Sequence, residues 1–177
     1  MISDRVKVYD GVFSHNYRST LFNLAQESLF RVGWVDDASP EWRGEMFLHS
    51  YANKEVILQS GILKEIKDNS PEIDKWLGTR FPQYSILNCD THADVHNAHS
   101  HLNMDVILIY LNQDWKLEWY GETLFYSEDL SEIIFAGLYT PGRIICFDGE
   151  VPHSIRPNSR LAPKFRYTMS LFFKKEK

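Results

Sequence analysis

The stretch Val106-Ile-Leu-Ile-Tyr-Leu111 decides the fold class, because it is a short apolar run with polar residues on either side. A run of this length is typical of a buried strand rather than of a helix. Turn-forming pairs such as Pro141-Gly142 and Asp148-Gly149 follow it along the chain. Short strands separated by such turns predict a sandwich or a barrel. The further strands are expected at residues 119–126, 133–139, 143–147 and 165–173.

The chain before about residue 81 is expected to be helical. Residues 18–32 carry apolar side chains at helical spacing, and Asn53 is placed to cap a second helix. The pair Ser70-Pro71 is typical of a third helix start. Residues 34–51 are polar and irregular, so we interpret them as a loop or as the roof of a site. The sequence therefore predicts a mainly β fold with N-terminal helices.

Length and composition limit the classes of protein that fit. The 177 residues are 44% hydrophobic, which is enough for one domain over residues 1–177. Within it, helical support over about residues 1–80 precedes a strand core over about residues 81–174. A net charge of −5 argues against nucleic acid or an anionic membrane as a partner. Cys89 and Cys146 are expected to be free thiols, no apolar run approaches the ~20 residues of a membrane span, and a cytoplasmic location is expected.

Histidines gather in one short stretch, and four of the seven lie within residues 92–101. His99 and His101 are two residues apart, so on a strand their side chains point to the same face. Two imidazoles on one face can bind a metal together. His153, which follows a turn in the strand-rich half, is the candidate third ligand.

The last expected strand carries polar side chains on one face. Arg166, Thr168 and Ser170 alternate with apolar residues, so they share that face. The face either meets solvent or forms a polar strip inside a barrel. In the interior, an arginine would bind a carboxylate through two parallel hydrogen bonds. Phe172 lies on the same face and favours the interior placement.

Five short motifs follow one another in the second half of the chain. They are Tyr110-Leu-Asn-x-x-Trp115, Trp119-x-Gly121-Glu-Thr-x-Phe125, Pro141-Gly-Arg-x-x-x-Phe147-Asp-Gly, Pro152-His-Ser and Arg166-Tyr-Thr. In this order they resemble the iron(II)/2-oxoglutarate dioxygenase superfamily, in its prolyl-4-hydroxylase-like branch, over about residues 85–174. The resemblance implies a double-stranded β-helix (jelly roll) core supported by α-helices. It also implies Fe(II) and 2-oxoglutarate as cofactors.

The resemblance assigns roles to individual residues. The family binds iron through a His-x-Asp pair and a distal histidine, and the distal histidine corresponds to His153. Arg166 corresponds to the basic residue that binds the far carboxylate of 2-oxoglutarate. Tyr110 and Ser170 match two further cofactor-binding positions, and Thr168 lies between Arg166 and Ser170 on the same strand face.

The first metal motif departs from the family pattern. In the family, the proximal histidine follows an Ala/Gly-Asp pair at a characteristic distance along the sequence. Counted from Ala93-Asp94, this histidine is His99, so His101 stands where the family has aspartate. We favour this arrangement, which gives a site with three histidines. An intact His-x-Asp at His92-Ala-Asp94 is the alternative, with Asp94 as the third ligand. Asp105, four residues after His101, is another candidate carboxylate ligand.

Three functions fit these residues and motifs. The favoured one is an Fe(II)/2-oxoglutarate-dependent oxygenase that uses O₂ to hydroxylate a prolyl-type peptide, an amino acid or another small molecule. The second is a cupin-like dioxygenase with a three-histidine iron and no cosubstrate, in which Arg166 would have no role. The third is a catalytically inactive jelly-roll binding module.

Overall fold

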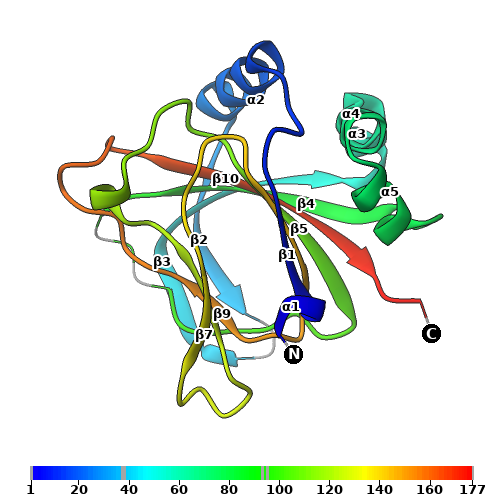
Figure 1. Ribbon diagram of the computed structural model, residues 1–177. Coiled ribbons are helices and arrows are strands. Elements are labelled where there is room, and N and C mark those ends of the chain that lie inside the picture. Colours follow the sequence, from blue (N-terminus) through cyan, green and yellow to red (C-terminus); the bar gives the residue numbers. More distant parts are fainter. Residues whose placement is uncertain (1, 37–38, 93, 95, 177) are drawn as a thin grey trace.

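Two antiparallel sheets form the core of the protein (Figure 1). The computed structural model describes residues 2–36, 39–92, 94 and 96–176, and the side chains of residues 2–3 and 34–47 lie outside this description. The larger sheet contains, in spatial order, β1 (Val6–Tyr9), β8 (Ile144–Asp148), β5 (Met104–Tyr110), β10 (Arg166–Lys174), β4 (Pro82–Asp90), β3 (Ser39–Asn53) and β2 (Arg31–Asp36). The smaller sheet contains β7 (Ile133–Gly137), β6 (Thr123–Tyr126) and β9 (His153–Ile155).

Strand β5 lies inside the larger sheet between β8 and β10, as its apolar sequence predicts. Side chains on a strand alternate between the two faces, so Ile107 and Ile109 belong to the core on the helical side. Val106 and Leu108 belong to a second core, which they share with Phe125 of β6. Both faces of β5 are therefore buried, which explains why its sequence is apolar without alternation.

Helices cover the face of the larger sheet that points away from β7 and β9 (Figure 1). The side chains of Ser14, Asn53 and Ser70 cap three of them, and each accepts a hydrogen bond from the backbone N–H three residues further along. The covering helices are α2 (His15–Glu27), α3 (Lys54–Ser60), α4 (Ile62–Asn69) and α5 (Pro71–Leu77). The chain also contains α1 (Ile2–Arg5) and the 3₁₀ turn η1 (Leu117–Trp119).

The expectation of a loop over residues 34–51 is wrong. Residues 31–36 and 39–53 form β2 and β3, and β3 pairs with β4 from Leu48 to Asn53. Pairing of β3 with β4, and of β2 with β3, supplies the extended conformation, which the local sequence does not show. The first 80 residues therefore contribute strands as well as helices, and the helix expected over 18–32 ends at Glu27.

The strand expected at 119–126 is also shorter than its sequence pattern indicates. It begins only at Thr123, because Tyr120 (φ 59°) and Gly121 (φ 81°) both have left-handed backbone conformations that interrupt an extended chain.

The two cysteines agree with the sequence prediction, since Cys89 and Cys146 are both buried free thiols. Among the residues that the structure describes, no helix has the length and apolar character needed to cross a membrane.

Candidate functional site

Three of the predicted histidines come together at one end of the two sheets. Each of His99, His101 and His153 offers a ring nitrogen, and these atoms all lie within 4.8 Å of one another. The ring centroids are 4.5 Å apart for His99 and His153, and 5.1 Å apart for His101 and His153. Ligand atoms at such distances can coordinate one metal ion.

Backbone hydrogen bonds place these histidines. His99 N donates to His153 O at 3.0 Å, and His153 N donates to His99 O at 2.9 Å, so the two residues form an isolated antiparallel bridge. His101 N donates to the carbonyl of Gly149, in the turn after β8, at 2.6 Å. The chain therefore brings together three candidate ligands from two segments that lie about 50 residues apart in the sequence.

The protonation of the rings suits metal binding. The Nδ1 atoms of His99 and His153 lie 3.0 and 2.9 Å from the carbonyl oxygens of Asn97 and Val151. A carbonyl can only accept, so each Nδ1 donates, and in the neutral ring Nε2 then carries the lone pair that can bind a metal. Burial lowers the pKa of His101 to about 3 and lowers the pKa of His153 well below its ordinary value. These two rings are therefore neutral at pH 7.

The alternative carboxylate ligands lie elsewhere. Asp94 is buried and accepts a hydrogen bond from Thr91 N at 2.5 Å. Ala93, within the His92-Ala-Asp94 motif, lies outside the described residues. Asp105 forms an ion pair with Arg80, on the helix-covered face of β5. The chain turns between His101 and Met104, so the alternation expected from residue 101 to residue 105 does not apply.

The polar strip of β10 faces the interior between the two sheets. Arg166 and Thr168 are fully buried, and Ser170 is 8% exposed. At the other end of the strip from Arg166, the Phe172 ring packs edge-on against His101, with centroids 4.9 Å apart. The strip therefore runs from Arg166 to the three histidines.

Tyr110 lies opposite this strip, since β5 pairs Tyr110 with Thr168. Its hydroxyl lies 2.8 Å from both Thr123 Oγ1 and the carbonyl oxygen of Gly137. Burial raises the pKa of Tyr110, so the hydroxyl stays protonated. The Tyr110 hydroxyl therefore forms its hydrogen bonds within the protein rather than with a ligand. The Tyr110 ring lies beside Arg166, with the guanidinium carbon 5.5 Å from the ring centroid.

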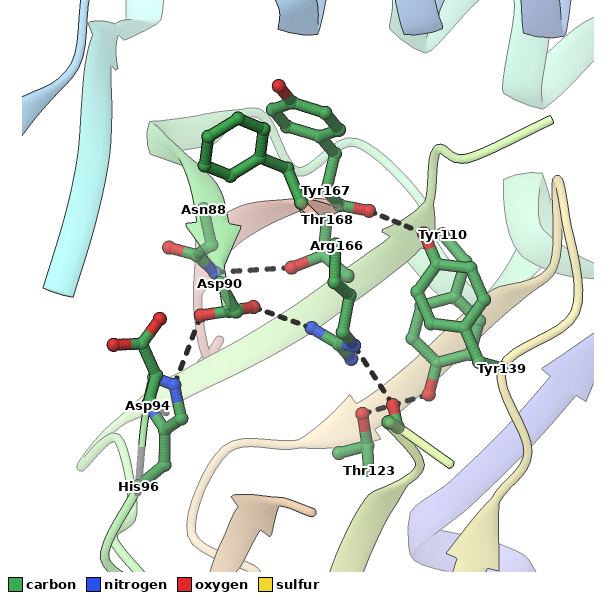
Figure 2. A network of polar contacts seen from close by, with 12 residues as sticks. Asn88, Asp90, Asp94, His96, Tyr110, Thr123, Tyr139, Arg166, Tyr167 and Thr168 are labelled. Carbon is green, nitrogen blue, oxygen red and sulfur yellow. Dashed lines mark hydrogen bonds and ion pairs between the residues drawn. The ribbon is translucent and has the colours of Figure 1, made fainter. Parts of the chain in front are cut away.

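Arg166 is surrounded by groups of the chain (Figure 2). Its Nε donates to Gly121 O at 2.9 Å, and one terminal nitrogen donates to Asp90 Oδ2 at 2.8 Å. The Tyr139 ring packs against the guanidinium at 5.0 Å. The second terminal nitrogen is buried and has no hydrogen-bond partner among the described residues.

Asp90 is a functional candidate that no motif in the sequence indicated. It lies between Arg166 and His96, and His96 Nε2 is 3.0 Å from Asp90 Oδ1 (Figure 2). Burial alone would raise the pKa of Asp90, but its contacts with His96 and Arg166 outweigh burial and hold the pKa below its ordinary value. The signal in the sequence is indirect: a buried arginine needs a counter-charge.

Comparisons with solved structures identify the fold. The chain resembles a Pseudomonas putida prolyl-4-hydroxylase (TM-score 0.61, 12% identity, covering 97% of this chain and 93% of that one). It also resembles a 2OG-Fe(II) oxygenase family oxidoreductase from Burkholderia pseudomallei (TM-score 0.69, 11% identity, 99% and 88%). A third match is a prolyl hydroxylase in complex with a hypoxia inducible factor peptide fragment, from Trichoplax adhaerens (TM-score 0.65, 14% identity, 98% and 84%). No protein-family model matches the sequence, and neither does any curated protein.

These matches confirm the double-stranded β-helix core with helical support that the sequence predicts. The residues present also fit the groups that this fold class implies. Three imidazoles form a nitrogen ligand set suited to iron. The unpartnered nitrogen of Arg166 and the hydroxyls of Thr168 and Ser170 can form hydrogen bonds with a polar ligand.

Proposed function

We propose that this chain is an Fe(II)- and 2-oxoglutarate-dependent oxygenase that uses O₂ to hydroxylate a peptide, an amino acid or another small molecule. The proposal depends on the cluster of three histidines, within 4.8 Å of one another, in a fold shared with solved oxygenases. His99, His101 and His153 would hold the metal. Three protein ligands leave other coordination positions open for a cosubstrate and for O₂.

When bound, Fe(II) and 2-oxoglutarate supply the oxidising chemistry that inserts oxygen into a C–H bond and releases succinate and CO₂. The residues of this chain contribute binding, orientation and exclusion of water. Phe147 and Phe172 pack against His153 and His101, with ring centroids 4.8 and 4.9 Å apart, and so cover the ligand rings with apolar surface. Arg166 offers one free nitrogen to the cosubstrate.

The charge of the site follows from its ligands. A neutral imidazole at position 101, in place of a carboxylate, leaves the full charge of Fe(II) at the centre. The site should therefore bind anionic ligands more strongly than a site with one carboxylate would. A peptide substrate is supported by the Trichoplax adhaerens relative, whose structure contains a peptide fragment.

The proposal is tested by loading purified protein with Fe(II) without O₂, then adding O₂ and measuring succinate released from 2-oxoglutarate. We expect release that His153→Ala abolishes and that His15→Ala, at an exposed histidine, leaves unchanged. Wild-type protein that binds no iron would contradict the proposal and would favour the binding module.

A cosubstrate-independent iron dioxygenase is the second candidate. The observation that favours it is the bond between Arg166 and Asp90, which partly satisfies the guanidinium without a ligand. It predicts that the iron-loaded protein binds no 2-oxo acid, and that Arg166→Met leaves iron binding intact.

A further inference from the structure

The guanidinium of Arg166 divides its hydrogen bonds between the protein and any ligand, because two of its five N–H groups already donate within the chain. Two of its three nitrogens donate to Gly121 O and to Asp90 Oδ2, at 2.9 and 2.8 Å. The third has no partner among the described residues, and the Tyr110 and Tyr139 rings lie 5.5 and 5.0 Å from the guanidinium carbon. Arginine binds a carboxylate most strongly through two parallel N–H groups. Because Nε already donates to Gly121 O, two parallel N–H groups for a ligand must come from the two terminal nitrogens, one of which also donates to Asp90 Oδ2.

Asp90 cannot easily move away from Arg166. The two residues are direct cross-strand partners, because β4 and β10 pair Asp90 with Arg166 in the register of the larger sheet. Both side chains are buried, and the second oxygen of Asp90 lies 3.0 Å from His96 Nε2. Leaving this position would expose a buried carboxylate to apolar surroundings and break contacts on both of its oxygens.

The charge of this pair also affects a ligand. Asp90 neutralises Arg166, so the pair offers no net positive charge to an incoming anion. A second carboxylate placed against the free nitrogen would lie close to the Asp90 carboxylate and would be repelled by it. A polar or apolar group without charge meets no such repulsion.

We propose that Asp90 is a specificity-determining residue. It binds one of the two terminal nitrogens of Arg166 that would otherwise bind the far carboxylate of a 2-oxo diacid. As a consequence, the chain accepts 2-oxo monocarboxylic acids about as well as 2-oxoglutarate. The inference rests on the proposed function, since it concerns the cosubstrate of the same metal site.

The test measures the binding of two acids by titration calorimetry. One is 2-oxoglutarate, and the other is 2-oxopentanoate, which has the same carbon chain without the far carboxylate. The protein is loaded with Ni(II), which follows Fe(II) in the Irving–Williams order and therefore binds the site at least as tightly. The measured quantity is the ratio of the two dissociation constants.

Wild-type protein should prefer 2-oxoglutarate by less than about 10-fold, which is less than one charge-assisted hydrogen bond contributes. Asp90→Asn keeps the shape of the side chain and removes its charge, so it should raise the preference at least ~10-fold, mainly through tighter binding of 2-oxoglutarate. Asp105→Asn is the matched control, because it changes another largely buried Asp–Arg pair on the opposite face of the same sheet. It should leave the ratio at the wild-type value.

A wild-type preference above about 10-fold would overturn this inference while supporting the proposed function. The wild-type ratio needs no variant, so it decides the matter even where Asp90→Asn does not fold. An Asp90→Asn protein that folds and keeps the wild-type ratio would also overturn the inference. If Ni(II)-loaded wild type and Asp90→Asn both bind neither acid, the proposed function fails, and the inference fails with it.

Discussion

Gly149, in the turn after β8, should control the position of a candidate metal ligand. Its carbonyl accepts from His101 N at 2.6 Å, and its own N–H donates to Met104 O at 2.8 Å. A Cβ at this position would lie 2.6 Å from Met104 O and 2.9 Å from His101 O. Both are backbone atoms, so no side chain can rotate to make room.

The size of the effect follows from this geometry. Non-bonded carbon and oxygen atoms approach to about 3.3 Å, so Gly149→Ala requires the 101–104 turn to shift by about 0.7 Å. Overpacking of this kind lowers the free energy of unfolding by ~1–3 kcal/mol. Because the same turn orients His101, the affinity for metal should fall ~10–100-fold, as for other groups that orient a ligand.

Urea unfolding of the metal-free protein and calorimetric titration with Ni(II) measure the two effects. The control is Gly61→Ala, where φ is +75° and nothing lies within 4 Å of the added Cβ. It should cost about 1–2 kcal/mol of stability through backbone strain and leave the Ni(II) affinity unchanged. A Gly149→Ala protein that binds Ni(II) as tightly as wild type would refute the reasoning.

Phe125 is fully buried between the two sheets, so Phe125→Ala should lower the free energy of unfolding by ~3–5 kcal/mol in urea. Metal-free protein should lose stability as the pH falls below 6.5. In the unfolded chain His101 and His153 then bind protons, whereas in the folded chain both stay neutral because burial lowers the pKa of His101 to about 3 and that of His153 well below its ordinary value. The loss approaches ~1.4 kcal/mol per pH unit for each histidine, and a flat profile of melting temperature from pH 7 to pH 5 would argue against it. Ni(II) at 100 times its dissociation constant should stabilise the protein by about 2.7 kcal/mol, and His153→Ala should remove most of this gain.

Three strands of the second half were predictable because their sequences carry the signal locally. β5, β8 and β10 begin and end within two residues of the expected positions. The strands β2 and β3 were not predictable, because β3 forms by pairing with β4 and β2 by pairing with β3, while their own residues are polar and irregular. A polar segment that becomes a strand by pairing with a distant strand shows no alternation of apolar and polar residues in its own sequence.

Part of the candidate metal site was also predictable from the sequence, because two of its histidines form a local pattern. The two-residue spacing of His99 and His101 is a local pattern, and the five motifs placed His153 in the same half of the chain. The contact between Asp90 and Arg166 joins residues 76 positions apart and depends on strand register, which no local pattern reveals.

The sequence by itself determined which segments are apolar enough to be buried strands and which side chains are candidates for the chemistry. Only the tertiary structure decided which of those side chains meet. His96 lies among four closely spaced histidines but contacts Asp90, while His99 and His101 join His153. The physical reason is that the pairing of strands, set by the packing of two cores at once, determines which polar groups share the interior.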